Sequence, residues 1–270
     1  MTEAKKVLFI TQAIMPYVPE TELSILGRRL PQTFQEHGTQ VRVFMPKWGH
    51  VNERRNQLHE VIRLSGMNLI INDSDHPLLI KVASIQQARL QIYFIDNDDY
   101  FQNRLMTADA EGTAYSDNDE RAIFYARGVL ETVKKLRWCP DIIHCQGWVS
   151  SFVPMYVKKA YRDDLAFRNC KIVFSPNEEW YDTTFSGDLA VKASFKGVNP
   201  EVVHEVVGNP ASFSDLYRLA IAYADGVVMS GVKESSPIND WVSSSGLPVL
   251  QDVNTDILFE SYQNFYNSIL

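Results

Sequence analysis

The sequence predicts an α/β domain with a Rossmann-like, doubly wound and mostly parallel sheet into which β-hairpins are inserted. Two observations lead to this fold class. Short apolar runs rich in β-branched residues, such as Val7–Thr11, Asp141–Cys145 and Lys171–Ser175, have the length and composition of buried strands. Helical stretches separate them, and buried strands that alternate with helices are typical of a parallel sheet. Because no linker, repeat or low-complexity tract interrupts this pattern, residues 1–270 are expected to form a single domain.

The chain begins with a strand–turn–helix unit. The strand Val7–Thr11 is followed by an open turn that contains two prolines, and a helix is predicted from about Thr21, where leucines recur at helical spacing. In doubly wound folds the turn after such a strand lies at the carboxyl edge of the sheet, where ligands bind. This first turn is therefore the place where a phosphate-binding site is expected if the chain has one.

The same patterns predict the remaining elements. After a strand at Gln40–Met45, three β-rich segments separated by turn residues are expected to form the hairpins: Val61–Asn72, Pro77–Ile85 and Arg89–Asp96. Helices are predicted at Asp117–Leu136, Val149–Tyr161, Ser214–Ala224 and Thr255–Ile269, with a further strand at Gly226–Ser230. The segment Asn177–Pro210 has little periodicity and is expected to be a long surface loop with short helices.

Composition narrows the class of protein. The formal net charge of −7, with Lys and Arg in doublets rather than in clusters, argues against nucleic acid as a partner. Three cysteines, an odd number without metal-ligand spacing, indicate reduced thiols and a cytoplasmic location. The apolar run near the start is too short for a signal peptide, and no stretch approaches membrane-spanning length, so no membrane partner is expected.

Six stretches in a fixed order carry a resemblance to a known family. They are KVLFIT…MPY…LP at the start, then GTQVRVFMPKW, IYFIDNDDYF, YSDNDERAIFYARGVLE, PDIIHCQGWVSSFVPMYVK and YADGVVMS. In this order they resemble the amino-terminal half of bacterial glycogen synthases and plant starch synthases, which form glycosyltransferase family 5. The resemblance implies a Rossmann-like domain that, in the family, binds the glucan acceptor and closes over the sugar nucleotide.

The chain departs from the family pattern at the first turn. In the family this turn carries Lys-x-Gly-Gly, followed three positions later by Asp; the Lys meets the ADP-glucose phosphates and the glycines let backbone amides approach them. Here Pro19 stands at the Lys, Thr21 and Glu22 stand at the glycines, and Ile25 stands at the Asp. Pro19 offers neither charge nor an amide hydrogen, and Glu22 places a carboxylate where a diphosphate would lie. We therefore predict that the phosphate site is lost.

Two further family sites and a whole domain also differ. The family stretch His-x-His-Asp-Trp-His is HCQGWV here, which keeps His144 and Trp148 but places Gly147 at the Asp. In the family stretch Thr-x-His-Asn, the His beside the sugar is replaced by Asn177, which cannot carry a charge or relay a proton. Family enzymes also have a second Rossmann domain with cationic groups on the diphosphate, and this chain ends about where that domain would begin.

Seven residues are candidate ligand-binding residues: Asp117, Asn118, Arg121, His144, Gln146, Trp148 and Asn177. Several have a structural alternative. The first three could form a helix N-cap with a local salt bridge, His144 could be a hydrogen-bonded core histidine, and Trp148 could be a core side chain. No catalytic residue, metal site or cofactor is predicted: Ser175 and Ser230 have no acid–base partner identifiable from sequence, and the acidic cluster at residues 73–76 is expected to be a turn.

These substitutions predict a glycogen/starch synthase-like domain that is non-catalytic by itself and acts as a module that binds a glucan, a small molecule or a protein. The alternative is a glucosyltransferase, from ADP-glucose to α-1,4-glucan, that is active only with a separate chain supplying the second domain. A different small-molecule enzyme that reuses the same cleft is a third hypothesis, because fold does not determine function.

The cleft face is expected to be a binding surface. Its rim should expose a set of mostly aromatic side chains, with Glu178 and Glu179 beside them: Tyr17, Val18, His144, Trp148, Trp180 and Tyr181. Large aromatic side chains at a surface are usually buried by a binding partner or by another segment of the chain. A protein partner or a second copy of the chain is the expected cover, and the segment Asn177–Pro210 folding back over the rim is the alternative.

Overall fold

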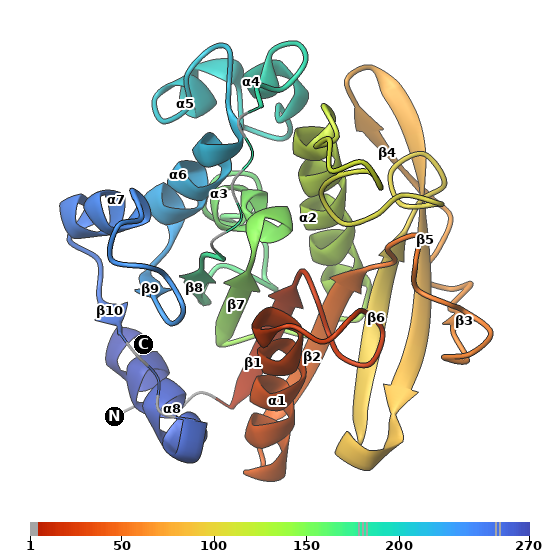
Figure 1. The fold of residues 1–270 in the computed structure, drawn as a ribbon, viewed down its shortest axis with the longest axis vertical. Helices are drawn as coiled ribbons and strands as arrows, with labels where there is room; N and C mark the ends of the chain where they lie inside the picture. The colour runs from red at the N-terminus through yellow and green to blue at the C-terminus, as the bar shows by residue number, and fades with distance from the viewer. Residues whose placement is uncertain (1–4, 178, 180, 182, 252, 254) are drawn as a thin grey trace.

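The structure is a computed structural model that describes residues 5–177, 179, 181, 183–251, 253 and 255–270. A twisted sheet runs through the centre of the molecule (Figure 1). Its main strands are β1 (Lys6–Thr11), β2 (Gln40–Pro46), β6 (Leu90–Asp96), β7 (Ile142–Gln146), β8 (Lys171–Ser175), β9 (Gly226–Val228) and β10 (Val249–Leu250). They lie in the order β10–β9–β8–β7–β1–β2–β6, and every neighbouring pair among them is parallel. The predicted doubly wound, mostly parallel sheet is therefore confirmed.

The predicted hairpins are present at one edge of this sheet. Strand β5 (Ser74–Ile85) pairs antiparallel with β6, with β4 (Met67–Ile71) and with the short β3 (His59–Glu60). The β4–β5 turn contains Asn72 and Asp73, both with positive φ, but the turn prediction for residues 73–76 is wrong beyond Asp73, because Ser74–His76 pair with β4 as the start of β5. The prediction for Val61–Asn72 was too long, because residues 61–66 precede β4 as turns and loop.

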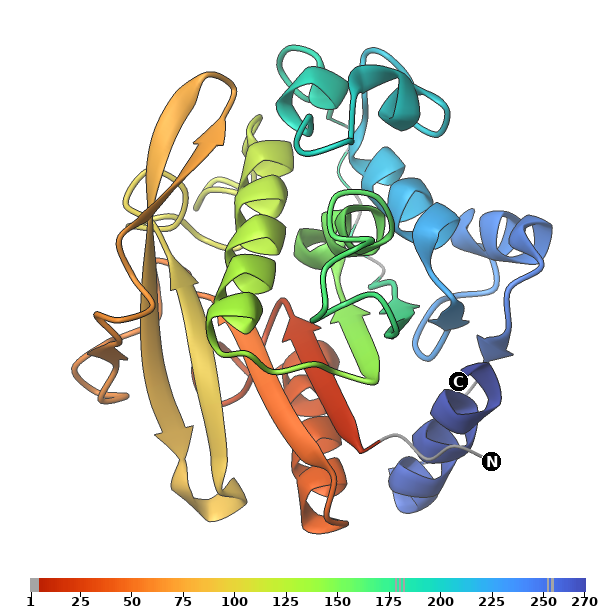
Figure 2. The ribbon, with the colours of Figure 1, turned by 180° about the vertical axis from the view of Figure 1, so that it is seen from behind.

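Helices cover both faces of the sheet. On one face, α1 (Glu22–Glu36) packs against α8 (Leu258–Ile269). The other face, turned toward the viewer in Figure 2, carries α2 (Asn118–Lys135), α3 (Phe152–Lys158) and α6 (Phe213–Tyr223). The long segment before α6 holds two short helices, α4 (Leu189–Lys192) and α5 (Pro200–His204), as expected. No helix in the described ranges is long and apolar enough to cross a membrane.

Three elements were not predicted, and two predicted helices begin later than expected. Strands β3 and β10 have two residues each, and α7 (Ile238–Ser245) is a short, serine-rich helix, so none gives a periodic signal. The helix predicted from Val149 starts with a 3₁₀ turn, Trp148–Ser150, before α3. Likewise, a 3₁₀ turn, Thr255–Ile257, precedes α8. None of these differences alters the sheet.

The sheet register sets the position of the candidate site. The last residues of three adjacent strands lie side by side, because Thr11 of β1 pairs with Gln146 of β7 and Gln146 pairs with Ser175 of β8. These strands are parallel, so their carboxyl ends share one edge, where doubly wound folds bind ligands. The turn that leads into α1 leaves from this edge.

Candidate functional site: a cleft at the carboxyl edge of the sheet

Two adjoining pockets form a cleft along this edge, and both are lined by Glu22, Leu23 and Asn177. The first, which we call the Gln12 pocket, has a volume of about 350 Å³ and is also lined by Gln12, Ala13, Thr21, Met106 and Glu179. The second, which we call the Tyr262 pocket, has a volume of about 110 Å³ and is also lined by Leu26, Gln146, Ser175, Pro176, Val228, Ser230, Gly231 and Tyr262. Among the described residues that line the two pockets, none is Lys or Arg.

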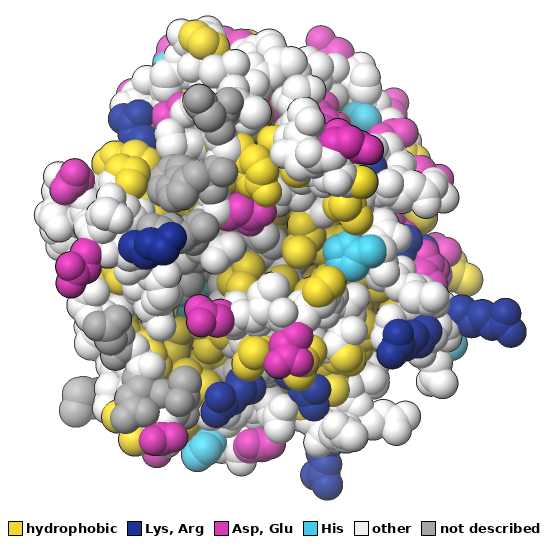
Figure 3. All heavy atoms as spheres, in the orientation of Figure 1, with side chains coloured by type: hydrophobic (Ala, Val, Ile, Leu, Met, Phe, Trp, Pro, Cys, Tyr) yellow, Lys and Arg dark blue, Asp and Glu magenta, His cyan; other side chains and the backbone are white. Residues whose placement is uncertain are grey.

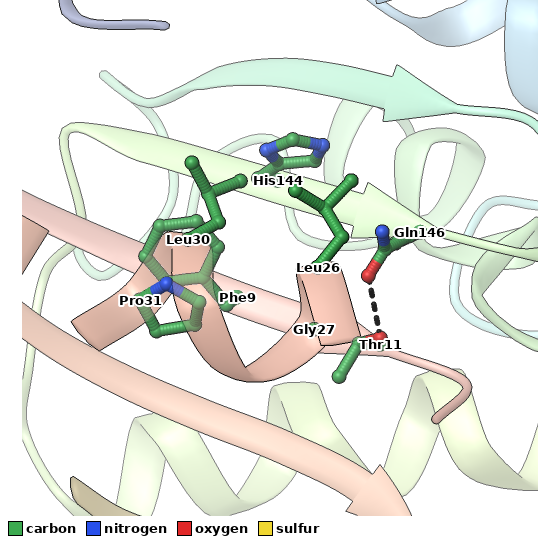
Figure 4. A pocket seen from close by; sticks show the side chains of 8 residues that line it. All are labelled: Phe9, Thr11, Leu26, Gly27, Leu30, Pro31, His144 and Gln146. Carbon is green, nitrogen blue, oxygen red and sulfur yellow. Dashed lines mark hydrogen bonds between the residues drawn. The ribbon is translucent and has the colours of Figure 1, made fainter. Parts of the chain in front are cut away.

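Helix α1 lies very close to the sheet beneath the cleft. Gly27 permits this approach, since a Cβ at this position would lie 2.1 Å from the carbonyl oxygen of Ala13. Across the same small space, Thr11 Oγ1 donates a hydrogen bond of 2.7 Å to Gln146 Oε1, which joins the ends of β1 and β7 (Figure 4). The first half of α1 therefore packs directly against the chain that leaves β1 at the cleft.

That helix end is capped by its own side chains. Thr21 Oγ1 accepts a hydrogen bond from the backbone N–H of Ser24, and Ser24 Oγ accepts one from the backbone N–H of Thr21. This capping box uses amides that an anion would otherwise bind, and the exposed Glu22 adds a carboxylate at the first helical residue. The geometry thus places a negative charge at the helix end, where the resemblance noted in the sequence predicts the family's diphosphate, and Pro19 lies just before it.

A second set of interactions fills the space beside Gly147. Gln12 Nε2 donates a hydrogen bond of 2.8 Å to Glu179, and Thr107 Oγ1 donates one of 2.5 Å to the other carboxylate oxygen of Glu179. The indole N–H of Trp148 in turn donates to Thr107 Oγ1 at 3.1 Å. Gly147 has a φ of +80°, and a Cβ there would lie 2.4 Å from Gln12 Oε1. The Gln12 side chain therefore fills the space that a side chain at position 147 would enter.

His144 was predicted either to bind a ligand or to be a hydrogen-bonded core histidine. In the structure it is buried and hydrogen-bonded, as a core histidine would be. Its Nε2 hydrogen-bonds Ser175 Oγ at 2.6 Å, and its Nδ1 hydrogen-bonds the hydroxyl of Tyr266 from α8 at 2.5 Å. Burial lowers the pKa of His144 to about 3, so the imidazole is neutral near pH 7. The structure supplies the partner for Ser175 that sequence could not identify. Within the described residues the hydrogen-bond partners of His144 are a phenol and a hydroxyl and not a carboxylate, so this buried imidazole is a poor general base.

We predict a pH-dependent stability that arises from His144. Its pKa is about 3 when folded, below its ordinary value of 6.5, so its contribution is complete above pH 6.5 and is lost as pH falls from 6.5 toward 3. The free energy of unfolding of the wild type should fall by up to roughly 1.4 kcal/mol per pH unit in this window, relative to His144→Asn. Urea titrations at pH 7, 6 and 5 measure the difference, and parallel pH profiles for the two proteins would contradict it.

Asp117, Asn118 and Arg121 form a structural cluster at the start of α2. Asp117 pairs with Arg104 at 2.5 and 2.7 Å, and its side chain makes no capping hydrogen bond, so of the predicted N-cap with salt bridge only the salt bridge is present. Burial alone would raise the pKa of Asp117, but its hydrogen bonds with Arg104 lower that pKa below the ordinary value. The buried Arg121 guanidinium donates to Asn118 Oδ1 and to the carbonyls of residues 100, 105 and 106, which anchors the loop before α2.

The prediction of an exposed aromatic rim is wrong for four of its six residues, which the structure shows to be buried. Tyr17, Val18, His144 and Trp148 have exposed fractions of 6%, 5%, 2% and 0%. Tyr181 is half-buried, with its ring against Phe213, and Trp180 and Glu178 lie outside the described residues. The physical reason is that the loop bearing Thr107 and the segment bearing Glu179 fold over the strand ends. On the face drawn in Figure 3, apolar side chains lie among interspersed acidic and basic ones.

Of the seven predicted residues, Gln146 and Asn177 line the cleft, whereas His144 and Trp148 lie beneath it and the α2 cluster lies apart from both pockets. Ligand binding by any of them remains a prediction.

Gln12 and Tyr262 were not singled out from sequence. Gln12 directly follows β1 and could have been suspected on that ground, but nothing local marks Tyr262, which comes from the far end of the chain. In the described part of the chain, no group of three or more His, Cys, Asp or Glu side chains could hold a metal ion.

The fold and cleft define a Rossmann-like domain with a ligand cleft at the carboxyl edge of its sheet, and comparison with known proteins identifies its family. The starch synthase catalytic domain model matches residues 6–230. Glycogen synthase from Chlorobium luteolum is 32% identical over 90% of this chain and 49% of its own length. Glycogen synthase from Chlorobium phaeovibrioides is 37% identical over 82% of this chain and 44% of its own length. The chain belongs to the starch synthase catalytic domain family.

A solved structure shows the same fold. The catalytic domain of starch synthase IV from Arabidopsis thaliana, bound to ADP and acarbose, aligns with a TM-score of 0.73 at 15% identity, over 95% of this chain and 53% of that one. This chain spans about half the length of the relatives it matches. The family resemblance inferred from the six sequence stretches is therefore confirmed.

Proposed function

We propose that this chain is a member of the starch synthase catalytic domain family that binds a neutral glucan or a related sugar in its cleft and does not transfer glucose from a nucleotide sugar. The observation that carries the proposal is the position of Glu22. Its carboxylate stands at the first residue of α1, in the wall shared by both pockets, where a sugar nucleotide would bring its diphosphate. Glu22 is exposed, so water and salt screen its charge, but a carboxylate at close range still disfavours a diphosphate.

Further features of the cleft support the same proposal. A transferring enzyme must stabilise the charge of the leaving diphosphate, and none of the described residues that line the two pockets is cationic. Arg29 lines a neighbouring hollow, two turns along α1 from Glu22. The amide, hydroxyl and carboxylate groups of the cleft can instead hydrogen-bond the hydroxyls of a sugar. The related starch synthase IV domain was solved with ADP and acarbose. Of a nucleotide and a sugar ligand, the lining of the present cleft favours the sugar.

Calorimetric titration tests this function. The wild type should bind maltoheptaose and should show no binding of ADP-glucose at the same concentrations. Glu22→Gln, which removes the charge and keeps the shape, is the matched control. It should leave the affinity for maltoheptaose within about threefold and raise the affinity for ADP-glucose. Tight binding of ADP-glucose by the wild type, or absence of binding to maltoheptaose, would contradict the proposal.

A second function is supported by the length of the relatives. Because these 270 residues span about half of each relative, a glucosyltransferase could be completed by a second half that lies outside them. In that case the wild type alone would be inactive, but a mixture with the separately expressed remaining half of the Chlorobium luteolum relative would incorporate glucose into glycogen. The first proposal predicts no incorporation in the mixture, since Glu22 and the capped helix end remain in place.

A further inference from the structure

The Tyr262 pocket contains a buried polar group that the fold leaves unused. Tyr262 lies on α8, its side chain is 0% exposed, and it lines the pocket. Among the described residues its hydroxyl has no hydrogen-bond partner. Buried hydroxyls are ordinarily paired, because the loss of their hydrogen bonds to water is costly. The neighbouring Tyr266 follows this rule, since its hydroxyl bonds His144. The unpaired hydroxyl of Tyr262 is therefore an exception that calls for a partner from outside the chain.

The rest of the pocket wall indicates the chemistry of that partner. Ser175, Asn177 and Ser230 bring hydroxyl and amide groups from the ends of β8 and β9, and Glu22 faces them from α1. Amides and hydroxyls both donate and accept hydrogen bonds, which suits a ligand that carries several hydroxyls. The carboxylate of Glu22, with no Lys or Arg among the described lining residues, disfavours an anionic ligand. The wall is thus matched to a neutral, hydroxyl-rich molecule.

We propose that the Tyr262 pocket binds a single neutral sugar unit and that the Tyr262 hydroxyl is its buried hydrogen-bond partner. The inference rests on the proposed function, a sugar-binding cleft, and adds the subsite and the size of the unit that it takes. Its volume of about 110 Å³ is below the roughly 300–1,000 Å³ of drug-sized sites, so the pocket has room for only one small unit.

The way in which the pocket is closed indicates which part of a longer ligand it takes. Tyr262 and His144, stacked with ring centroids 5.7 Å apart, are buried behind the pocket, and α8 covers this side of the sheet. A glucan that entered from the adjoining Gln12 pocket, past the shared Glu22 and Asn177, would end against Tyr262, which lines the pocket. The pocket therefore holds the end of a glucan or a free sugar, and lengthening the glucan adds little to the affinity.

Tyr262→Phe tests the assignment because it removes the hydroxyl alone. Titration with maltose and with maltoheptaose should give affinities within about fivefold of each other for the wild type, and Tyr262→Phe should weaken both about tenfold. Its melting temperature without sugar should be unchanged or higher, since an unpaired buried group is lost. Tyr156→Phe is the matched control: Tyr156 is equally buried but donates to the carbonyl of Ala193. That variant should lower the melting temperature and leave the affinity for maltose unchanged.

The possible failures are distinguishable. If the wild type binds maltose or maltoheptaose and Tyr262→Phe binds it equally well, this subsite assignment is overturned and the proposed function stands. If the wild type binds neither sugar, the proposed function itself is overturned. An affinity for maltoheptaose a hundredfold above that for maltose would overturn the chain-end assignment, because the sugar would then lie across the cleft.

Discussion

Replacing Arg121 with Met is expected to lower the free energy of unfolding by about 3–5 kcal/mol. The Arg121 guanidinium is fully buried and donates to three backbone carbonyls and to Asn118, so its removal leaves several buried acceptors unpaired at roughly 1–3 kcal/mol each. Burial lowers the pKa of Arg121 to about 9, which still leaves the group charged at pH 7. Urea denaturation at pH 7 measures the effect.

Arg218→Met is the control for this first variant. Arg218 pairs with Asp215 at 3.0 Å but its side chain is 44% exposed, so its loss should cost less than about 1 kcal/mol. Equal effects of the two variants would mean that the α2 cluster does not anchor its loop. A stable Arg121→Met variant with altered sugar affinity would instead favour the ligand-binding interpretation of Asp117, Asn118 and Arg121.

Gly147→Asp, which restores the residue of the family pattern, should destabilise this protein by roughly 2–4 kcal/mol. Gly147 has φ of +80° and ψ of +168°, a conformation that only glycine adopts readily. The new side chain would also collide with Gln12, which Glu179 holds in place. Thermal and urea denaturation measure the loss.

A double-mutant cycle separates the two causes. Gln12→Ala should recover about 1 kcal/mol or more in the Gly147→Asp background, because it removes the collision and leaves the backbone strain. Gly112→Asp serves as a control for strain alone: Gly112 has φ of +86° and open space around the added Cβ, so a loss of about 1 kcal/mol is expected. If Gly147→Asp proves as mild as Gly112→Asp, then Gln12 does not fill the space that a side chain at position 147 would enter.

The arrangement of the sheet could be predicted from sequence because buried strands carry a local signal. The run Lys171–Ser175 was predicted to the residue, and the first strand and helix were placed within a residue or two. Their apolar composition and helical spacing are properties of a few adjacent residues. Strands of two residues, such as Val249–Leu250, have no such period and gain their pairing only from the folded sheet.

The burial of the cleft residues could not be predicted, because it depends on contacts between distant parts of the chain. Gln12 and Glu179, which hydrogen-bond each other, are 167 residues apart, and His144 and Tyr266 are 122 apart. A sequence pattern showed that Trp148 follows a strand, but not that the loop bearing Thr107 would cover it. The substitutions at Glu22 and Asn177, by contrast, could be read directly, and both residues line the cleft.

The central claim, that the cleft of this chain does not support glucosyl transfer, is tested most directly in a chimera. Residues 6–230 would replace the matching part of the Chlorobium luteolum glycogen synthase, so that the second half of an authentic relative is present. Incorporation of glucose from ADP-glucose into glycogen is then measured beside the parent enzyme, with maltoheptaose binding as the check of folding. We predict a chimera that binds maltoheptaose and incorporates no glucose above background. Incorporation at a rate within tenfold of the parent would contradict the account and establish the cleft as a working half of a transferase.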